Sequence, residues 1–127
     1  MGVSPKVTYG FRFLLSLALV VMTYLLLNKP SGNVSGWMIN DKVAHGLGFF
    51  VLAGVTDLAF PRSSFVWKAL PLCAYGLLTE YLQLQTGYRH FSWWDWLADI
   101  VGVVCFMPFR RPVYRWLERW FPRQNGL

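Results

Sequence analysis

Charged residues are scarce in this sequence of 127 residues. Asp, Glu, Lys and Arg make up only 14% of it, whereas hydrophobic residues make up 55%. Soluble domains carry about 25% charged residues. Only six residues are acidic and only two are histidines. A chain so poor in charge lacks the surface of an ordinary soluble domain, and its composition indicates a lipid environment.

The sequence also lacks the short motifs of common enzymes. It has no nucleophile elbow, no His-Glu-x-x-His zinc motif and no phosphate-binding loop. No basic and aromatic platform lies outside the apolar runs, so we expect no nucleic-acid partner despite the net charge of +6. Cys73 and Cys105 lie inside apolar runs as small packing residues. We therefore assign no cofactor and no metal ligand.

Four long apolar runs account for most of the chain. They predict an all-α membrane protein with transmembrane helices at about residues 11–28, 43–60, 66–85 and 93–109. Asn28-Lys29-Pro30 ends the first run without a small-residue cleavage site, so we interpret that run as an uncleaved helix. Residues 1–110 are thus predicted to form a single four-helix domain.

Residues 111–127 form a basic tail with a helical pattern. Val113, Trp116, Leu117 and Trp120 recur at helical spacing after Pro112, and arginines take the other faces. This predicts an amphipathic helix that lies on the cytoplasmic membrane surface. A docking site for a partner protein is the alternative.

The basic residues also predict the orientation. One membrane face would receive most of the twelve Lys and Arg residues, and the other only Lys29, Lys42 and Arg89. The positive-inside rule then places both termini in the cytoplasm, and the first and third loops face outward.

With that topology, polar residues gather at the outer ends of predicted helices two to four. Within each helix they are three or four residues apart and share one face. A charge in the bilayer centre costs about 2.5–3.5 kcal/mol on insertion scales, so such residues pair or line a wet cavity. We predict an outward polar pocket whose ligand-binding residues are Asp41, Lys42, His45, Glu80, Gln83, Arg89, Asp95 and Asp99. A structural alternative stays open, in which these residues pair only to fix helix register.

The same residues resemble a known family. Asp41-Lys42-x-x-His45-x-x-x-Phe49, Tyr75-Gly76-x-x-x-Glu80-x-x-Gln83, Arg89 and Asp95-x-x-x-Asp99-x-x-Gly102 are similar, in order and spacing, to the signatures of VanZ-like membrane proteins. The resemblance covers residues 38–104. It implies a small multi-pass protein of the bacterial cytoplasmic (inner) membrane. The family is named for a protein associated with teicoplanin resistance. Asp99 is a departure, because the family pattern often has Asn there.

Three functions follow as hypotheses. The first is non-enzymatic binding of a lipid headgroup, a lipid-linked cell-wall precursor or a lipophilic glycopeptide antibiotic, the last by analogy. The alternative is a membrane enzyme acting on a lipid-linked substrate, with His45, Glu80 and Asp95 as catalytic candidates in acid/base or metal-assisted chemistry. Transport is disfavoured because the charges stop at one face. We expect binding rather than catalysis.

Association between copies is a separate question. Gly46, Gly48 and Gly54 in the second apolar run permit close helix contacts in lipid. They leave a homo-oligomer open.

Overall fold

The computed structural model describes residues 3–27, 34–87 and 91–122, and it leaves the side chains of residues 34–41 undescribed. Within these residues the chain is helical and contains no strand, as the sequence predicted. The helices are α1 (Pro5–Leu27), α2 (Val34–Ala59), α3 (Phe65–Gln85), α4 (Trp93–Cys105), the 3-10 helix η1 (Met107–Phe109) and α5 (Arg110–Trp120).

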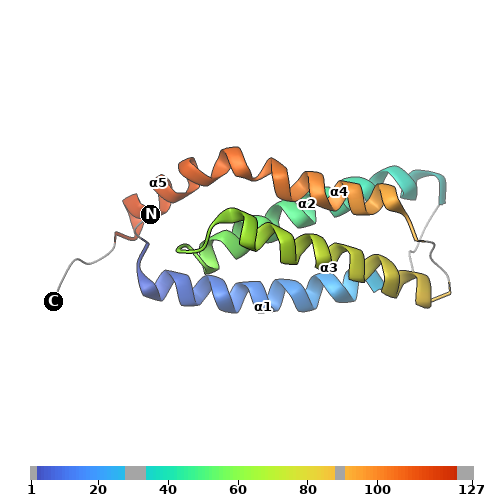
Figure 1. Cartoon of the computed structure of the whole chain (residues 1–127), viewed down its shortest axis with the longest axis horizontal. Coiled ribbons are helices and arrows are strands. Elements are labelled where there is room, and N and C mark those ends of the chain that lie inside the picture. The colour runs from blue at the N-terminus through green and yellow to red at the C-terminus, as the bar shows by residue number, and fades with distance from the viewer. Residues whose placement is uncertain (1–2, 28–33, 88–90, 123–127) are drawn as a thin grey trace.

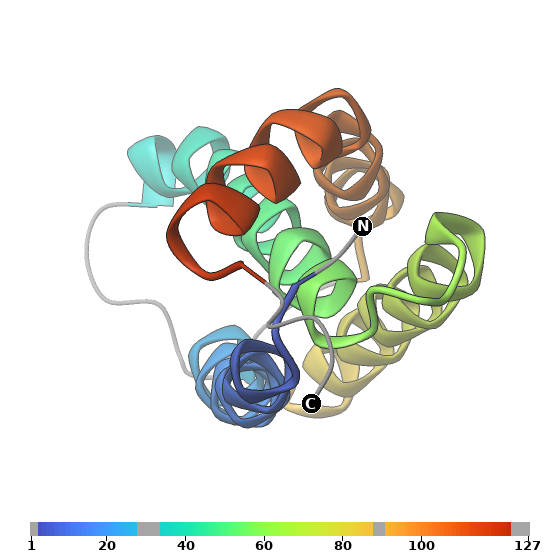
Figure 2. The same cartoon turned by 90° about the vertical axis from the view of Figure 1, so that its left-hand side faces the viewer.

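The four long helices run side by side and alternate in direction (Figure 1). Seen end-on, α2 lies at the centre (Figure 2), and it contacts α1, α3 and α4. Its contact with α4 is the most extensive. A backbone bridge between Val3 and Pro122 brings the two ends of the described chain to one end of the bundle. The four long helices thus return the described chain to the end of the bundle at which it starts.

The helix limits differ from the prediction mainly at the amino-terminal ends. α1 begins at Pro5 and α2 at Val34, well before the apolar runs begin. Hydropathy detects only the apolar part of a helix, and each of these helices also includes more polar turns that precede its apolar run. Proline suits the start of α1 because its missing N–H and fixed φ cost nothing there.

The fourth helix is shorter than predicted. α4 ends at Cys105, and η1 follows around Pro108 with Phe109 N donating to Phe106 O at 2.9 Å. Pro108 has no N–H for a helical hydrogen bond, which explains the change of helix type. α5 then begins at Arg110, and Pro112 lies in its first turn. Proline is tolerated there because the first N–H groups of a helix have no intrahelical partners.

Two of the described helices are long and apolar enough to cross a bilayer. They are α1 and the part of α2 from Lys42 to Ala59. α3 is long enough but carries Lys68, Glu80 and Gln83, and α4 has only 13 residues. Helix length and composition thus support two of the four predicted crossings.

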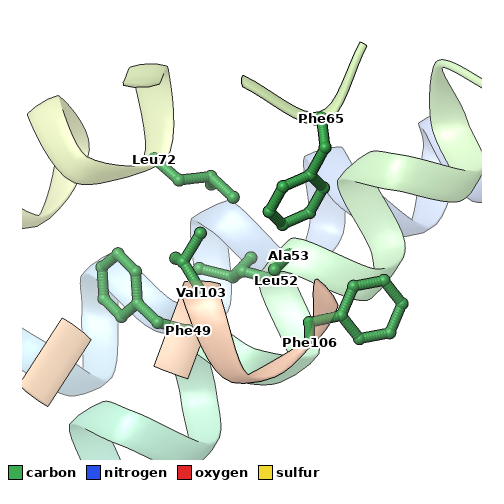
Figure 3. Packing of buried hydrophobic residues seen from close by; sticks show 7 residues of the cluster. All are labelled: Phe49, Leu52, Ala53, Phe65, Leu72, Val103 and Phe106. Atoms are coloured by element: carbon green, nitrogen blue, oxygen red, sulfur yellow. The ribbon is translucent and has the colours of Figure 1, made fainter. Parts of the chain in front are cut away.

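The apolar core lies between α2, α3 and α4 (Figure 3). Its buried residues are Phe49, Leu52, Ala53, Phe65, Leu72, Val103 and Phe106. Phe50 adds an edge-to-face contact with the Phe106 ring at 5.6 Å between centroids. Phe49 is fully buried, as expected for a packing residue.

The glycines of α2 face other helices of the same chain. A Cβ at Gly48 would overlap Met22 of α1, and one at Gly54 would lie 3.0 Å from the Phe106 ring. Gly46 lies opposite α4, where its carbonyl oxygen meets Gly102 so closely that a Cβ at residue 102 would overlap it. These glycines therefore serve packing within one chain.

α5 packs part of its apolar face on the bundle end. Tyr114 and Leu117 are buried with Val3 and Leu58, and the Tyr114 hydroxyl donates to Asp57 O at 2.8 Å. Burial, with the Asp57 carboxylate nearby, raises the pKa of Tyr114, so the phenol stays protonated and keeps donating. Trp116 and Trp120 remain exposed. The amphipathic pattern predicted this helix, and the fold adds a docking contact that the pattern did not specify.

Candidate functional site

Three helices bring titratable side chains together at one end of the bundle. We name this set the polar cluster: Lys42 and His45 of α2, Glu80 of α3, and Asp95 and Asp99 of α4. Glu80 lies in the last turns of α3 and Asp95 in the first turn of α4. His45, Glu80, Asp95 and Asp99 are all buried. The structure thus brings these five predicted site residues together at one end of the bundle.

Glu80 joins α3 to the start of α4. The Ser92 side chain caps α4 by accepting a hydrogen bond from Asp95 N at 3.3 Å. The backbone N–H of the same Ser92 donates to Glu80 Oε2 at 3.2 Å. One serine therefore fixes both Glu80 and the first turn that carries Asp95.

His45 is the centre of the cluster. Its Nδ1 lies 2.8 Å from Asp99 Oδ1 and 3.9 Å from Glu80 Oε1. Gly76 makes room for the Asp99 carboxylate, since a Cβ there would lie 2.8 Å from Oδ2. The imidazole is held by Asp99 and faces a second carboxylate from another helix.

Lys42 forms the accessible edge of the cluster. Its Nζ lies 3.1 Å from Asp95 Oδ1, and 40% of the lysine side chain is exposed, against 9% of the aspartate side chain. The ion pair therefore links a partly exposed lysine to a buried carboxylate of the cluster. A half-exposed lysine is easily displaced, because such pairs contribute at most about 1 kcal/mol.

The other predicted site residues have different positions. Gln83 is buried, and its amide nitrogen donates to Leu26 O at 2.6 Å, which ties α3 to α1. Asp41 belongs to α2, but its side chain lies outside the described residues, as does all of Arg89. Gln83 is thus engaged in helix packing, while Asp41 and Arg89 stay predictions.

The Gln83 bond gives a test of that packing role. We expect Gln83→Met to lower the free energy of unfolding by about 1 kcal/mol, the usual net worth of one hydrogen bond. Thermal unfolding of the purified chain, followed by circular dichroism in detergent, measures it. Gln85→Met, at an exposed position of the same helix, is the matched control and should change nothing. Equal effects of the two changes would contradict the assignment.

A second charged group lies at the opposite end of the bundle. We name it the Asp57 cluster: Asp57, Lys68, Arg110 and Tyr114. Asp57 is fully buried, with Oδ1 2.5 Å from Lys68 Nζ and Oδ2 2.9 Å from Arg110 Nε. The sequence predicts that Asp57 pairs with Arg62 or another basic residue of the same membrane face, and Lys68 and Arg110 are such partners. Arg110 reaches Asp57 only after η1 turns the chain back.

Two cavities are described, and neither includes a residue of the polar cluster. One, of about 360 Å³, lies by the start of α1 and the α2–α3 turn and is lined by residues that include Arg12 and Arg62. The other, of about 410 Å³, is a mostly apolar groove between α1 and α3 near Trp67 and Tyr75. The outward pocket predicted from the sequence at the polar cluster stays a prediction, since Asp41 and Arg89 of that set lie outside the described side chains.

The charges of the polar cluster limit what it can bind. Three carboxylates face one lysine and one imidazole, so the described groups are acidic in balance even when His45 is protonated. Glu80 Oε1 is buried and accepts no hydrogen bond from any described residue. The cluster therefore suits a cation or a hydrogen-bond donor better than an anion. The His45 and Asp99 pair is also the arrangement that orients an imidazole for proton transfer.

Sequence and fold were also compared with those of known proteins. Comparisons with protein-family models, with curated proteins and with solved structures each return no match for this chain.

Proposed function

We propose that this chain is a multi-pass protein of the bacterial cytoplasmic membrane, with both termini in the cytoplasm. In it, the polar cluster binds the headgroup of a lipid or lipid-linked cell-wall precursor. All four long helices cross the bilayer, and the polar cluster lies toward the outer face. The resemblance of residues 38–104 to VanZ-like proteins also supports this proposal. It places glycopeptide antibiotics of the teicoplanin type among the ligands to test.

The distribution of side chains supports the membrane part. The apolar window of α1 is only 6% buried, whereas a core helix of a soluble protein is mostly buried. Large apolar residues such as Phe13, Val20 and Trp67 are exposed, while Asp57, Glu80 and Asp99 are interior. A soluble monomer rarely exposes apolar surface on this scale. Polar groups inside and apolar groups outside satisfy the energetics of a bilayer.

One observation carries the binding part. Glu80 Oε1 is a buried carboxylate oxygen with no described hydrogen-bond donor, beside two more buried carboxylates. An unsatisfied buried acceptor costs about 1–3 kcal/mol, and more when charged, so a ligand that donates to it gains that much. The headgroup we infer therefore carries an amine or several hydroxyls. It enters by displacing Lys42 from Asp95.

Ligand binding in lipid nanodiscs tests this proposal. Fluorescent phosphatidylethanolamine, phosphatidylglycerol, a lipid-linked disaccharide precursor and labelled teicoplanin form the panel. We expect saturable binding of an amine- or hydroxyl-bearing member, weakened roughly tenfold or more in Glu80→Gln, the equivalent of one charge-assisted hydrogen bond. Glu118→Gln makes the same chemical change on α5 and should leave binding intact. Failure of the whole panel to bind the wild-type chain would overturn the proposal.

Catalysis is a second candidate, and the His45 and Asp99 contact of 2.8 Å favours it. An imidazole oriented by a carboxylate can take a proton from a hydroxyl or water. Turnover of the lipid-linked panel by purified protein, abolished by His45→Ala, would identify an enzyme. A preparation that binds a ligand and leaves it chemically unchanged would identify a binding protein.

A further inference from the structure

Three side chains of the polar cluster have the identity and spacing of metal ligands. They are His45, Glu80 and Asp99, one from each of α2, α3 and α4, and all three are buried. One ligand atom from each lies within 4.8 Å of the others. Neither Lys42 nor Asp95 belongs to the set. Sequence reasoning assigned no metal ligand, although its enzyme alternative considered a divalent ion held by the acidic residues of this cluster and His45.

The charge balance of this set favours a dication. Glu80 and Asp99 are two buried carboxylates beside one imidazole, and the nearest described lysine, Lys42, is paired with Asp95. Lys68 and Arg110 are committed to Asp57 at the other end of the bundle. Buried charges persist when they are paired or when they coordinate a metal. A divalent cation would compensate both carboxylates at once.

Glu80 supplies an observation independent of this proximity. Its two oxygens have different surroundings. Oε2 accepts a hydrogen bond from the Ser92 N–H, while Oε1 accepts none from any described residue and lies 3.9 Å from His45 Nδ1. A ligating carboxylate is typically held in this way, with one oxygen anchored by a hydrogen bond and the other presented to the ion.

We propose that His45, Glu80 and Asp99 bind a divalent transition-metal cation, with Zn²⁺ as the preferred ion. Zinc takes imidazole nitrogen at about 2.0–2.1 Å and carboxylate oxygen at about 2.0–2.2 Å. Ligand atoms around such an ion lie roughly 3–4 Å apart, and the observed Nδ1 separations of 2.8 and 3.9 Å need only small adjustments.

The donor set also selects among metals. The imidazole nitrogen disfavours Mg²⁺ and Ca²⁺, which prefer oxygen ligands. Three protein ligands leave a fourth tetrahedral position open, as in zinc sites that take water or substrate. That position would receive a hydroxyl or amine of the headgroup. The inference rests on the site of the proposed function, although metal binding does not depend on which headgroup binds.

Metal titration of the full-length chain in detergent tests the proposal. The protein is stripped with a chelator, dialysed and titrated with Zn²⁺ in a calorimeter, with Co²⁺ absorption as a second readout and Mg²⁺ as the comparison ion. We expect one Zn²⁺ per chain, visible Co²⁺ bands of a four-coordinate site, and no Mg²⁺ binding. Each of His45→Ala, Glu80→Gln and Asp99→Asn should weaken Zn²⁺ binding by roughly tenfold or more, since changes even to outer-shell groups cost that much.

Matched variants separate the site from adventitious binding. His90→Ala removes the other histidine, and Glu118→Gln makes the same change as Glu80→Gln at a carboxylate of α5, outside the polar cluster. Both should keep the wild-type affinity. Glu80→Gln preserves shape, and unchanged circular dichroism would show that its effect is not unfolding. The metal site would be overturned if the chain did not bind about one Zn²⁺ or Co²⁺ ion. It would also be overturned if His90→Ala weakened Zn²⁺ binding as much as His45→Ala does. Headgroup binding that persists after chelation would support the proposed function and show that it does not require the metal ion.

Discussion

Replacing Asp57 by alanine is expected to lower the free energy of unfolding by about 3–5 kcal/mol, the cost of removing one partner from a buried ion pair. Asp57 is fully buried and neutralises both Lys68, itself 4% exposed, and Arg110. The alanine variant leaves two cations without their counter-charge at the junction of α2, α3 and α5. Thermal or denaturant unfolding of the purified chain in detergent measures the loss.

A double variant separates lost charge from lost packing. Asp57→Ala with Lys68→Met removes the interior lysine charge together with its partner, and it should recover part of the stability lost in Asp57→Ala alone. Glu118→Ala is the control, because it removes a carboxylate from the less buried surface of α5. A loss below about 1 kcal/mol in Asp57→Ala would show that the pair behaves like a surface salt bridge.

The same cluster shows how far the sequence can predict this fold. Long apolar runs located α1 to α4, and the 3.6-residue pattern located α5, because both signals are local. The docking of α5 is not local. It depends on η1 turning the chain near Pro108 so that Arg110 meets Asp57 and Tyr114 reaches its carbonyl. No pattern within a single helix specifies that turn.

The order of the apolar runs predicts that the polar cluster residues lie near one end of the bundle, but it does not predict which of them pair. Alternating helix directions place Lys42, Glu80 and Asp95 near one end, and this requires only the order of the runs. Which atoms meet depends on the rotation of each helix about its axis and on how closely α2 and α4 approach. The contact of His45 with Asp99 and the ion pair of Lys42 with Asp95 follow from that approach. The sequence therefore predicts that these residues meet, but not which atoms pair.

Gly102→Ala tests what sets that approach, and it is expected to cost about 1–3 kcal/mol, as overpacking a tight contact does. A Cβ at residue 102 would overlap Gly46 O and lie 3.1 Å from Phe50 N. Both are backbone atoms, so no side-chain rotation relieves the overlap and α4 must move away from α2. Unfolding in detergent gives the stability change.

Gly46→Ala provides the sharpest comparison, since this residue lies directly across the contact. A Cβ at Gly46 would meet only Ala98 O at 3.6 Å, an ordinary contact, and alanine gains about 1 kcal/mol of helix propensity over glycine. We expect Gly46→Ala to be neutral or stabilising, like Gly10→Ala, whose Cβ would meet nothing within 4 Å.

Gly102 is one turn from Asp99, and Gly46 is adjacent to His45. Separation of α2 from α4 by Gly102→Ala should therefore also weaken Zn²⁺ binding, whereas Gly46→Ala should preserve it. Equal tolerance of both substitutions would mean that the helices have room to shift and that the glycine contact does not set the geometry of the polar cluster.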